Sequence, residues 1–243
     1  MHFSSIPFLI AIISGFLGFL ILRLRRLGLV NNAEHNGVIA LIVVLLLWGG
    51  VSGFLADWGI YARKDFLAMA PGYWLPFIPV IITVILMSVF KPLRNGLRKL
   101  VDGSPGHWLT GIHMIRILAT GSLVKASNGL FPEKFAWYVG IPDLIFGVSA
   151  VVITLWARKG RVSDRGLMAW HMLGAMVILV PANGFMHLYM QEALFEELFV
   201  FPMVLAPTLV VPTLVMLNLL VVWRSIEKNM SRNTRANSLA KPE

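Results

Sequence analysis

Long apolar segments alternate with short polar segments along the whole chain. A helix of about 20 apolar residues is long enough to cross a hydrocarbon core of roughly 30 Å. We therefore predict a membrane-spanning helix for each apolar segment that approaches this length. There are seven such segments, at residues 6–22, 37–56, 72–90, 106–123, 136–156, 167–188 and 198–223.

The polar segments between the predicted helices are too short to form a second domain. Residues 1–223 are therefore predicted to form one transmembrane domain, a seven-helix bundle of the all-α class, followed by a basic and polar tail at residues 224–243. Composition supports this interpretation, because 57% of the residues are hydrophobic and only 14% are charged. A soluble domain carries about 25% charged residues, so we predict a polytopic membrane protein whose first partner is the lipid bilayer.

The basic residues gather in alternate polar segments. Sixteen of the 21 Lys and Arg residues follow the first, third, fifth and seventh apolar segments. Because basic loops tend to stay in the cytoplasm, we predict a multi-pass protein of the cell inner (plasma) membrane with its N-terminus outside and its C-terminus in the cytoplasm. The net charge of +9 then reflects membrane orientation, and no nucleic-acid partner is predicted.

Two apolar segments each contain one charged residue that a bilayer should exclude. Arg116 lies within residues 106–123, and Asp143 lies within residues 136–156. Each charge alone costs roughly 2.5–3.5 kcal/mol at the centre of a bilayer, and the helical rise per residue places the two positions at similar depth. We therefore predict that the two side chains meet, directly or through water, and face a polar site inside the bundle.

Polar and small residues accompany the two charges at helical spacing. On an α-helix, spacings of three or four positions place residues on one face. The face with the arginine is polar and contains Thr110, His113, Arg116 and Thr120. The face with the aspartate permits the close approach of another helix, and it contains Asp143, Gly147, Ala150 and Thr154.

The last two apolar segments add further candidates. Asn183 and His187, four positions apart, share a helix face in the same predicted outer half as the charged pair. The last segment is predicted to bend or unwind and to form a wall of the cavity, because each proline in it removes a backbone donor. We expect threonine side chains or water to satisfy the carbonyls that these prolines leave free. The prolines are Pro202, Pro207 and Pro212.

The candidate ligand-binding residues lead to a hypothesis for function. They are Arg116, Asp143, His113, Thr120, Asn183 and His187. We expect the protein to bind or translocate a small anionic or amphipathic ligand in an outward-opening cavity. Arg116 is the expected anchor, because its planar fork of donors suits an anionic group, and Asp143 is its expected partner.

Two other functions remain open. Two histidines on facing helices can hold a haem b, so His113 and His171 permit a membrane oxidoreductase or an electron carrier. A scaffold or assembly factor without a ligand is the second alternative, because Arg116 and Asp143 can simply tie two helices together.

The sequence predicts no metal site, and no cofactor apart from the haem alternative. It has no cysteine, and a catalytic zinc normally needs three protein ligands. No phosphate-binding loop or hydrolase motif occurs in it, and the sequence makes no prediction of enzymatic activity.

Overall fold

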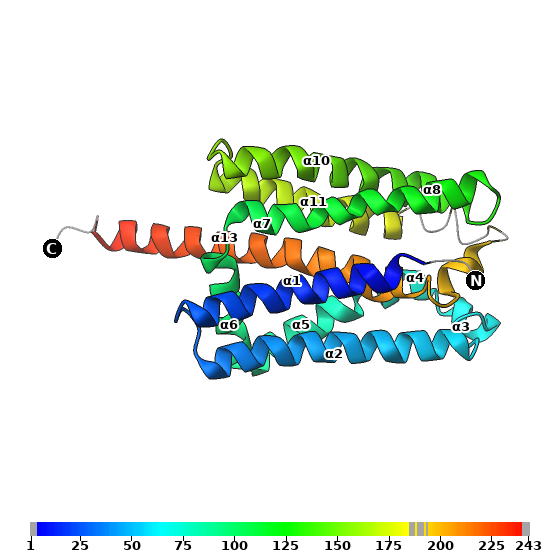
Figure 1. Cartoon of the computed structure of the whole chain (residues 1–243), viewed down its shortest axis with the longest axis horizontal. Helices are drawn as coiled ribbons and strands as arrows, with labels where there is room; N and C mark the ends of the chain where they lie inside the picture. Colours follow the sequence, from blue (N-terminus) through cyan, green and yellow to red (C-terminus); the bar gives the residue numbers. More distant parts are fainter. Residues whose placement is uncertain (1–3, 185–187, 189–191, 193, 240–243) are drawn as a thin grey trace.

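A computed structural model describes residues 4–184, 188, 192 and 194–239 of the chain. Within these residues every regular element is a helix, and the helices run side by side as an elongated bundle (Figure 1). The prediction of an all-α fold is therefore confirmed.

The first half of the chain forms two long helices, a third helix in several pieces, and a shorter helix after it. In chain order these are α1 (Ile6–Arg26), α2 (Asn32–Asp57), the short α3 (Lys64–Ala68), α4 (Pro71–Trp74), η1 (Leu75–Phe77), α5 (Ile78–Val89) and α6 (Lys91–Gly103). α2 begins before the predicted residue 37 because Asn31 and Glu34 form a capping box, in which each side chain accepts a hydrogen bond from the backbone N–H of the other.

The second half of the chain forms helical stretches in which four segments depart from α-helical winding. The elements are α7 (Gly106–Gly111), the 3₁₀ segment η2 (Ile112–Ala119), α8 (Thr120–Ser127), α9 (Glu133–Phe135), the π turn η3 (Ala136–Gly140), α10 (Ile141–Arg158), α11 (Asp164–Gly184), the short 3₁₀ turn η4 (Phe195–Phe199), the π turn η5 (Ala206–Val210) and α13 (Val211–Leu239).

Five helices within the described residues are long and apolar enough to cross a membrane, which identifies the chain as a membrane protein. The predicted spans at residues 106–123 and 167–188 fall on the stretch α7–η2–α8 and largely on α11, which are not among these five. Their crossing of the bilayer stays a prediction. The five helices cover Ile6–Arg26, Asn32–Asp57, Pro71–Val89, Glu133–Arg158 and Ala206–Ser231.

The last long helix begins at Ala206 rather than at residue 198, because prolines interrupt the hydrogen bonding of its first turns. Pro212 has no N–H to donate to the backbone oxygen of Thr208, four residues earlier. The indole Nε1 of Trp48 on α2 donates to this oxygen instead, at 2.9 Å. The freed carbonyl of Thr208 therefore accepts from a tryptophan, where a threonine or water was expected.

The predicted polar tail at residues 224–243 continues α13 as helix as far as Leu239, and residues 240–243 lie outside the described part of the chain. Ion pairs with α6 hold the first turns of this extension. Asp102 accepts hydrogen bonds from Arg224 at 2.6–2.9 Å and lies 2.7 Å from the Nζ of Lys228. Glu227 pairs with Arg98 in the same way. The helix therefore does not end where the apolar segment ends.

Acid is expected to loosen this attachment of α13 to α6. Burial tends to raise the pKa of Asp102, but hydrogen bonds from Arg224 and Lys228 outweigh it and hold the pKa below its ordinary value of 3.8. A carboxyl group with a lowered pKa stabilises the fold above that ordinary value, and the contribution is lost as the pH falls through the lowered pKa. Relative to the intrinsic rate, hydrogen exchange at residues 224–239 should therefore speed up below about pH 4. Asp102→Asn removes this titration, so an unchanged pH dependence in that variant would contradict the assignment.

α13 runs through the middle of the bundle (Figure 1). On one side of it lie α7–η2–α8, α10 and α11, and on the other side lie α1, α2, α5 and α6. In the last long helix, 67% of the most apolar 18-residue stretch is buried. The corresponding share in the other four helices is 17–33%. These four therefore turn most of their apolar surface outward, as expected where the surrounding solvent is lipid.

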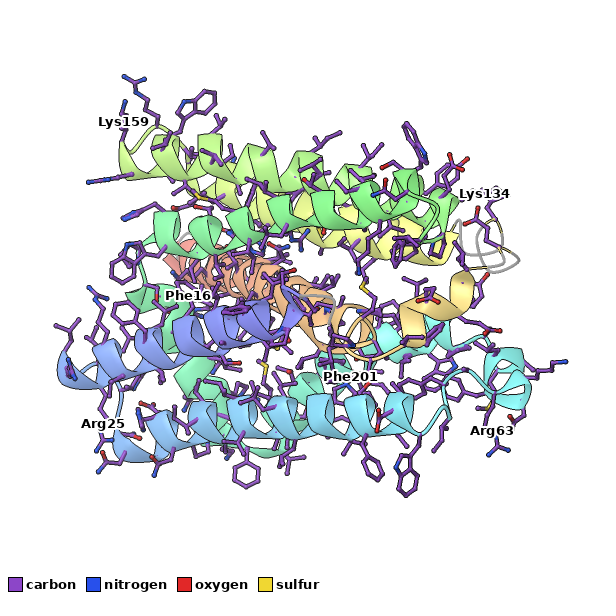
Figure 2. The ribbon with its side chains drawn as sticks, turned by 45° about the vertical axis from the view of Figure 1, so that its right-hand side comes forward. Phe16, Arg25, Arg63, Lys134, Lys159 and Phe201 are labelled. Atoms are coloured by element: carbon purple, nitrogen blue, oxygen red, sulfur yellow. The ribbon has the colours of Figure 1, made fainter. Side chains whose placement is uncertain are left out.

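The two ends of the bundle carry different groups of basic residues. Arg25 and Lys159 lie at one end, called the basic end below, and Arg63 and Lys134 lie at the opposite end (Figure 2). For these four residues, the two ends agree with the division that the sequence predicts.

Candidate functional site

The two helical stretches that contain the buried charges pack directly on each other. A Cβ at Gly147 of α10 would lie only 2.7 Å from the backbone nitrogen of Ile117 in η2. Further along the same contact, the hydroxyl oxygens of Thr110 and Thr154 are 3.0 Å apart. The small residues on α10 thus let two backbones approach closely at the level of the two charges.

The 3₁₀ winding of η2 decides which residues of the predicted polar face are buried. Three residues complete a 3₁₀ turn, so positions i and i+3 lie in line. Thr110, His113 and Arg116 follow this spacing, and all three are buried. Thr120 is four positions beyond Arg116, which turns it away by about 120°. Thr120 is exposed and donates to the backbone oxygen of Ile117 at 2.7 Å, so the buried polar face ends at Arg116.

Arg116 and Asp143 form a direct ion pair, as the sequence predicts. The Nη1 of Arg116 donates to Oδ1 of Asp143 at 3.1 Å and to the backbone oxygen of Gly174 on α11 at 3.1 Å. The guanidinium carbon lies 4.8 Å from the centre of the Phe146 ring, which places the cation over an aromatic face. One side chain of η2 therefore contacts both α10 and α11. Its remaining nitrogens, Nε and Nη2, are buried and have no hydrogen-bond partner among the described residues.

A cavity of about 440 Å³ borders this ion pair. One wall comes from α1, η1 and η5, and the facing wall comes from η2, α8, η3 and α10. Its volume is within the range of roughly 300–1,000 Å³ that is typical of ligand sites. The wall is mostly apolar, with residues such as Ile115, Val139, Ile178, Met203 and Leu214. Apart from Arg116 and Asp143, the charged lining residue in the described part of the chain is Lys125.

All four segments with non-α winding in the second half of the chain border the cavity, including η4, whose Phe195, Leu198 and Phe199 line it. Arg116 belongs to η2, Gly140 belongs to η3 just before α10, and Pro207 belongs to η5 just before α13. Long 3₁₀ segments and π turns are uncommon, and they often mark functional sites or hinges. Their convergence on one cavity favours a site over a simple packing contact, and Pro207 supplies the wall that was predicted from the prolines.

His113 and His171 meet beside the ion pair. Their ring centres are 5.7 Å apart, and the Nδ1 of His171 lies 2.7 Å from the side-chain oxygen of Asn218. The rings of Phe146 and Trp170 pack on His113 with centres 5.9 and 5.7 Å away. Neither histidine is among the described residues that line the cavity. The two candidate haem ligands are thus adjacent but surrounded by aromatic rings, and haem binding stays a prediction.

The other candidate residues are less informative. Asn183 belongs to the last turn of α11, but its side chain lies outside the described part of the chain, as does the whole of His187. Within the described residues, no group of three or more histidine or acidic side chains could hold a metal ion.

Sequence reasoning missed the residues that shape the cavity away from the ion pair. Gly121 of α8 lines it, and a Cβ there would meet no atom within 4 Å. Residues of α1 and η4 line it as well, although they are distant in sequence from both charges. A single sequence gives no signal for these contacts, because they depend on how separate helices pack.

The fold and the ion pair together define an all-helical membrane protein with a polar site beside a cavity. Residues 73–225 match the model of a family that is described as a domain of unknown function, DUF8737, and the chain belongs to this family. No curated protein and no solved structure matches the chain. The matched residues include Arg116, Asp143 and both histidines of the site, whereas α1 and α2 precede them.

Proposed function

We propose that the chain crosses the inner (plasma) membrane seven times, with its N-terminus outside and its C-terminus in the cytoplasm. The support is the excess of basic residues after the odd-numbered apolar segments, where 16 of the 21 Lys and Arg lie, because Lys and Arg are enriched in cytoplasmic loops. Arg25 and Lys159 of this larger group lie at the same end of the bundle (Figure 2). The stretch α7–η2–α8 and the helix α11 then add two crossings to the five long apolar helices. These two contain Arg116, His113 and His171, which lower their apolarity.

We further propose that the protein binds or translocates a small amphipathic ligand. The observation that carries this proposal is the cavity beside Arg116 and Asp143. Its apolar wall suits a hydrocarbon chain, and its buried charged part, formed by Arg116 and Asp143 and called the floor below, suits a head group. Ionisable residues inside a membrane commonly mark substrate and ion pathways. The exposed lining residues Gly121 and Lys125 lie on α8, toward the end opposite the basic end (Figure 1). In the proposed orientation, the ligand therefore enters from the outer side.

Filling the cavity should abolish this binding. Gly121→Trp adds a bulky side chain at a residue that lines the cavity, without a backbone clash, because no atom lies within 4 Å of a Cβ at this position. The purified protein is extracted with solvent, and bound amphiphiles are measured by mass spectrometry. We expect the amphiphile recovered from wild type to fall about tenfold or more in the variant, which corresponds to a loss of roughly 1.4 kcal/mol or more in binding free energy.

Gly50→Trp is the matched control for this experiment. Gly50 is exposed on α2, and a Cβ there also meets no atom within 4 Å. It does not line the cavity in the described part of the chain, so the control corrects for lipid that adheres to the outer surface. Equal recovery from the two variants would refute binding in the cavity.

The electron-carrier alternative has one observation in its favour, the 5.7 Å between the ring centres of His113 and His171. The absorption spectrum of the purified protein distinguishes it from the ligand-binding proposal, because a bound haem gives a Soret band.

A further inference from the structure

The floor of the cavity presents a carboxylate rather than a guanidinium. The side chain of Asp143 is 11% exposed, whereas that of Arg116 is 1% exposed. Phe146 lies over the guanidinium, and Nη1 is already hydrogen-bonded to Asp143 and to Gly174. The other carboxylate oxygen, Oδ2, has no hydrogen-bond partner within the part of the chain that the structure describes. A ligand that reaches the floor therefore meets a hydrogen-bond acceptor.

This arrangement disfavours an anionic head group. An ionised carboxylate accepts hydrogen bonds but donates none, and a second anion beside it would be repelled strongly where little water is present. The donors that Arg116 has left are Nε and Nη2, and both are enclosed by protein. Arg116 is therefore a positioning residue that holds Asp143. Asp143, rather than Arg116, is the residue that would bind the head group of the ligand.

The cost of desolvating Asp143 argues for a ligand whose head group lies at the floor. Lys125 is exposed at the rim of the cavity. A ligand with its head at the rim would place its hydrocarbon end against the Asp143 carboxylate, which would lose water without gaining a hydrogen bond. A ligand with its head at the floor satisfies this carboxylate and leaves its tail against apolar residues such as Val139 and Met203.

We propose that the ligand is a lipid-sized molecule with a neutral hydroxyl head, and that this hydroxyl donates a hydrogen bond to Asp143. The inference rests on the proposed function and narrows the ligand class to amphiphiles whose uncharged head donates a hydrogen bond, with long-chain or isoprenoid alcohols as the proposed members. The source of the selectivity is the acceptor at the floor, since the apolar wall alone would accept a hydrocarbon chain with any head group.

Three photoreactive probes test the inference with the full-length protein in nanodiscs of zwitterionic lipid. They share one diazirine-bearing chain and end in a primary alcohol, in its methyl ether, or in a carboxylic acid. Cross-links to the cavity residues Ile115, Val139 and Met203 are counted by mass spectrometry. Cross-links to the lipid-facing residues Ile145 and Val148, which are 63% and 51% exposed, correct for the concentration of each probe in the bilayer. We expect the alcohol to label the cavity residues about tenfold or more above the ether and the acid, because a hydrogen bond to a charged group is worth at least that factor.

Two variants separate the chemistry of Asp143 from its structural role. Asp143→Asn keeps an oxygen acceptor and removes the negative charge, so labelling by the alcohol should persist while labelling by the acid rises. The double variant Arg116→Met/Asp143→Leu removes both charges together and leaves no unpaired ion, so it protects the fold. In this variant the alcohol and its ether should label the cavity residues equally, and the acid should stay excluded because an ionised head would lose water in an apolar site.

The possible results distinguish a failure of the hydroxyl inference from a failure of the proposed function. Preference for the acid, or equal labelling by all three probes in the wild type, overturns the hydroxyl inference and leaves ligand binding in place. If no probe labels the cavity residues above the lipid-facing residues, both the inference and the proposed function are overturned.

Discussion

Replacing Arg116 by methionine is expected to lower the free energy of unfolding by about 3–5 kcal/mol, because the variant leaves a buried carboxylate without its counter-ion. Asp143 is only 11% exposed at its side chain and receives its hydrogen bond from Arg116 at 3.1 Å. The loss can be measured by reversible unfolding in mixed micelles, followed by tryptophan fluorescence. If Arg116→Met were as stable as the wild type, Asp143 would not be a buried charge that depends on Arg116.

The double variant Arg116→Met/Asp143→Leu should recover most of this loss. Replacing both members of a buried ion pair by apolar residues of similar volume is often neutral or stabilising. The same variant separates the ligand-binding function from the scaffold alternative. A scaffold needs the two helices held together and should keep working, whereas the ligand site should lose its selectivity while the protein stays folded.

Gly147→Ala is expected to have the second large effect, a loss of about 1–3 kcal/mol or more in the free energy of unfolding. The new Cβ would lie 2.7 Å from the backbone nitrogen of Ile117 and 2.9 Å from the backbone carbonyl carbon of Arg116. Backbone atoms cannot rotate away as a side chain can, so α10 and η2 must separate. That separation would also lengthen the ion pair, and the same unfolding measurement detects the cost.

Gly50→Ala is the comparison for this second prediction. Gly50 is exposed on α2, and a Cβ there meets no atom within 4 Å. Alanine is the better helix former by up to about 1 kcal/mol, so this variant should be as stable as the wild type or slightly more stable. If Gly147→Ala behaved in the same way, the close approach of α10 and η2 would be refuted.

The solvation argument from the sequence located the ion pair, but the assumption of regular α-helix misplaced a neighbour. Lone charges in apolar segments are costly in lipid, and this alone predicted the contact between Arg116 and Asp143. Thr120 was added at α-helical spacing, and it is exposed because η2 winds as a 3₁₀ helix. The sequence carries no strong signal for that winding, since no proline lies within η2.

The cavity and the end of the last helix depend on contacts between distant segments. Gly121 borders a space whose other wall comes from α1 and η5, and no local pattern links these segments. Residues 224–239 have a polar composition that indicates a tail, yet they continue the helix, and Asp102 pairs with Arg224 and Lys228 in its first turns. Charge patterns could have indicated such pairs only if the position of α6 were already known.

The indole of Trp48 has a practical meaning for work on this family. It donates from α2, ahead of the family-matched residues 73–225, to the Thr208 oxygen that Pro212 leaves free. A recombinant fragment cut to the shared region would lose that donor. The fragment would also lose the part of the cavity wall that α1 supplies through Ile6 and Leu9. We therefore expect a fragment of residues 73–225 to lack part of the cavity wall, and assays belong on a chain that includes α1 and α2.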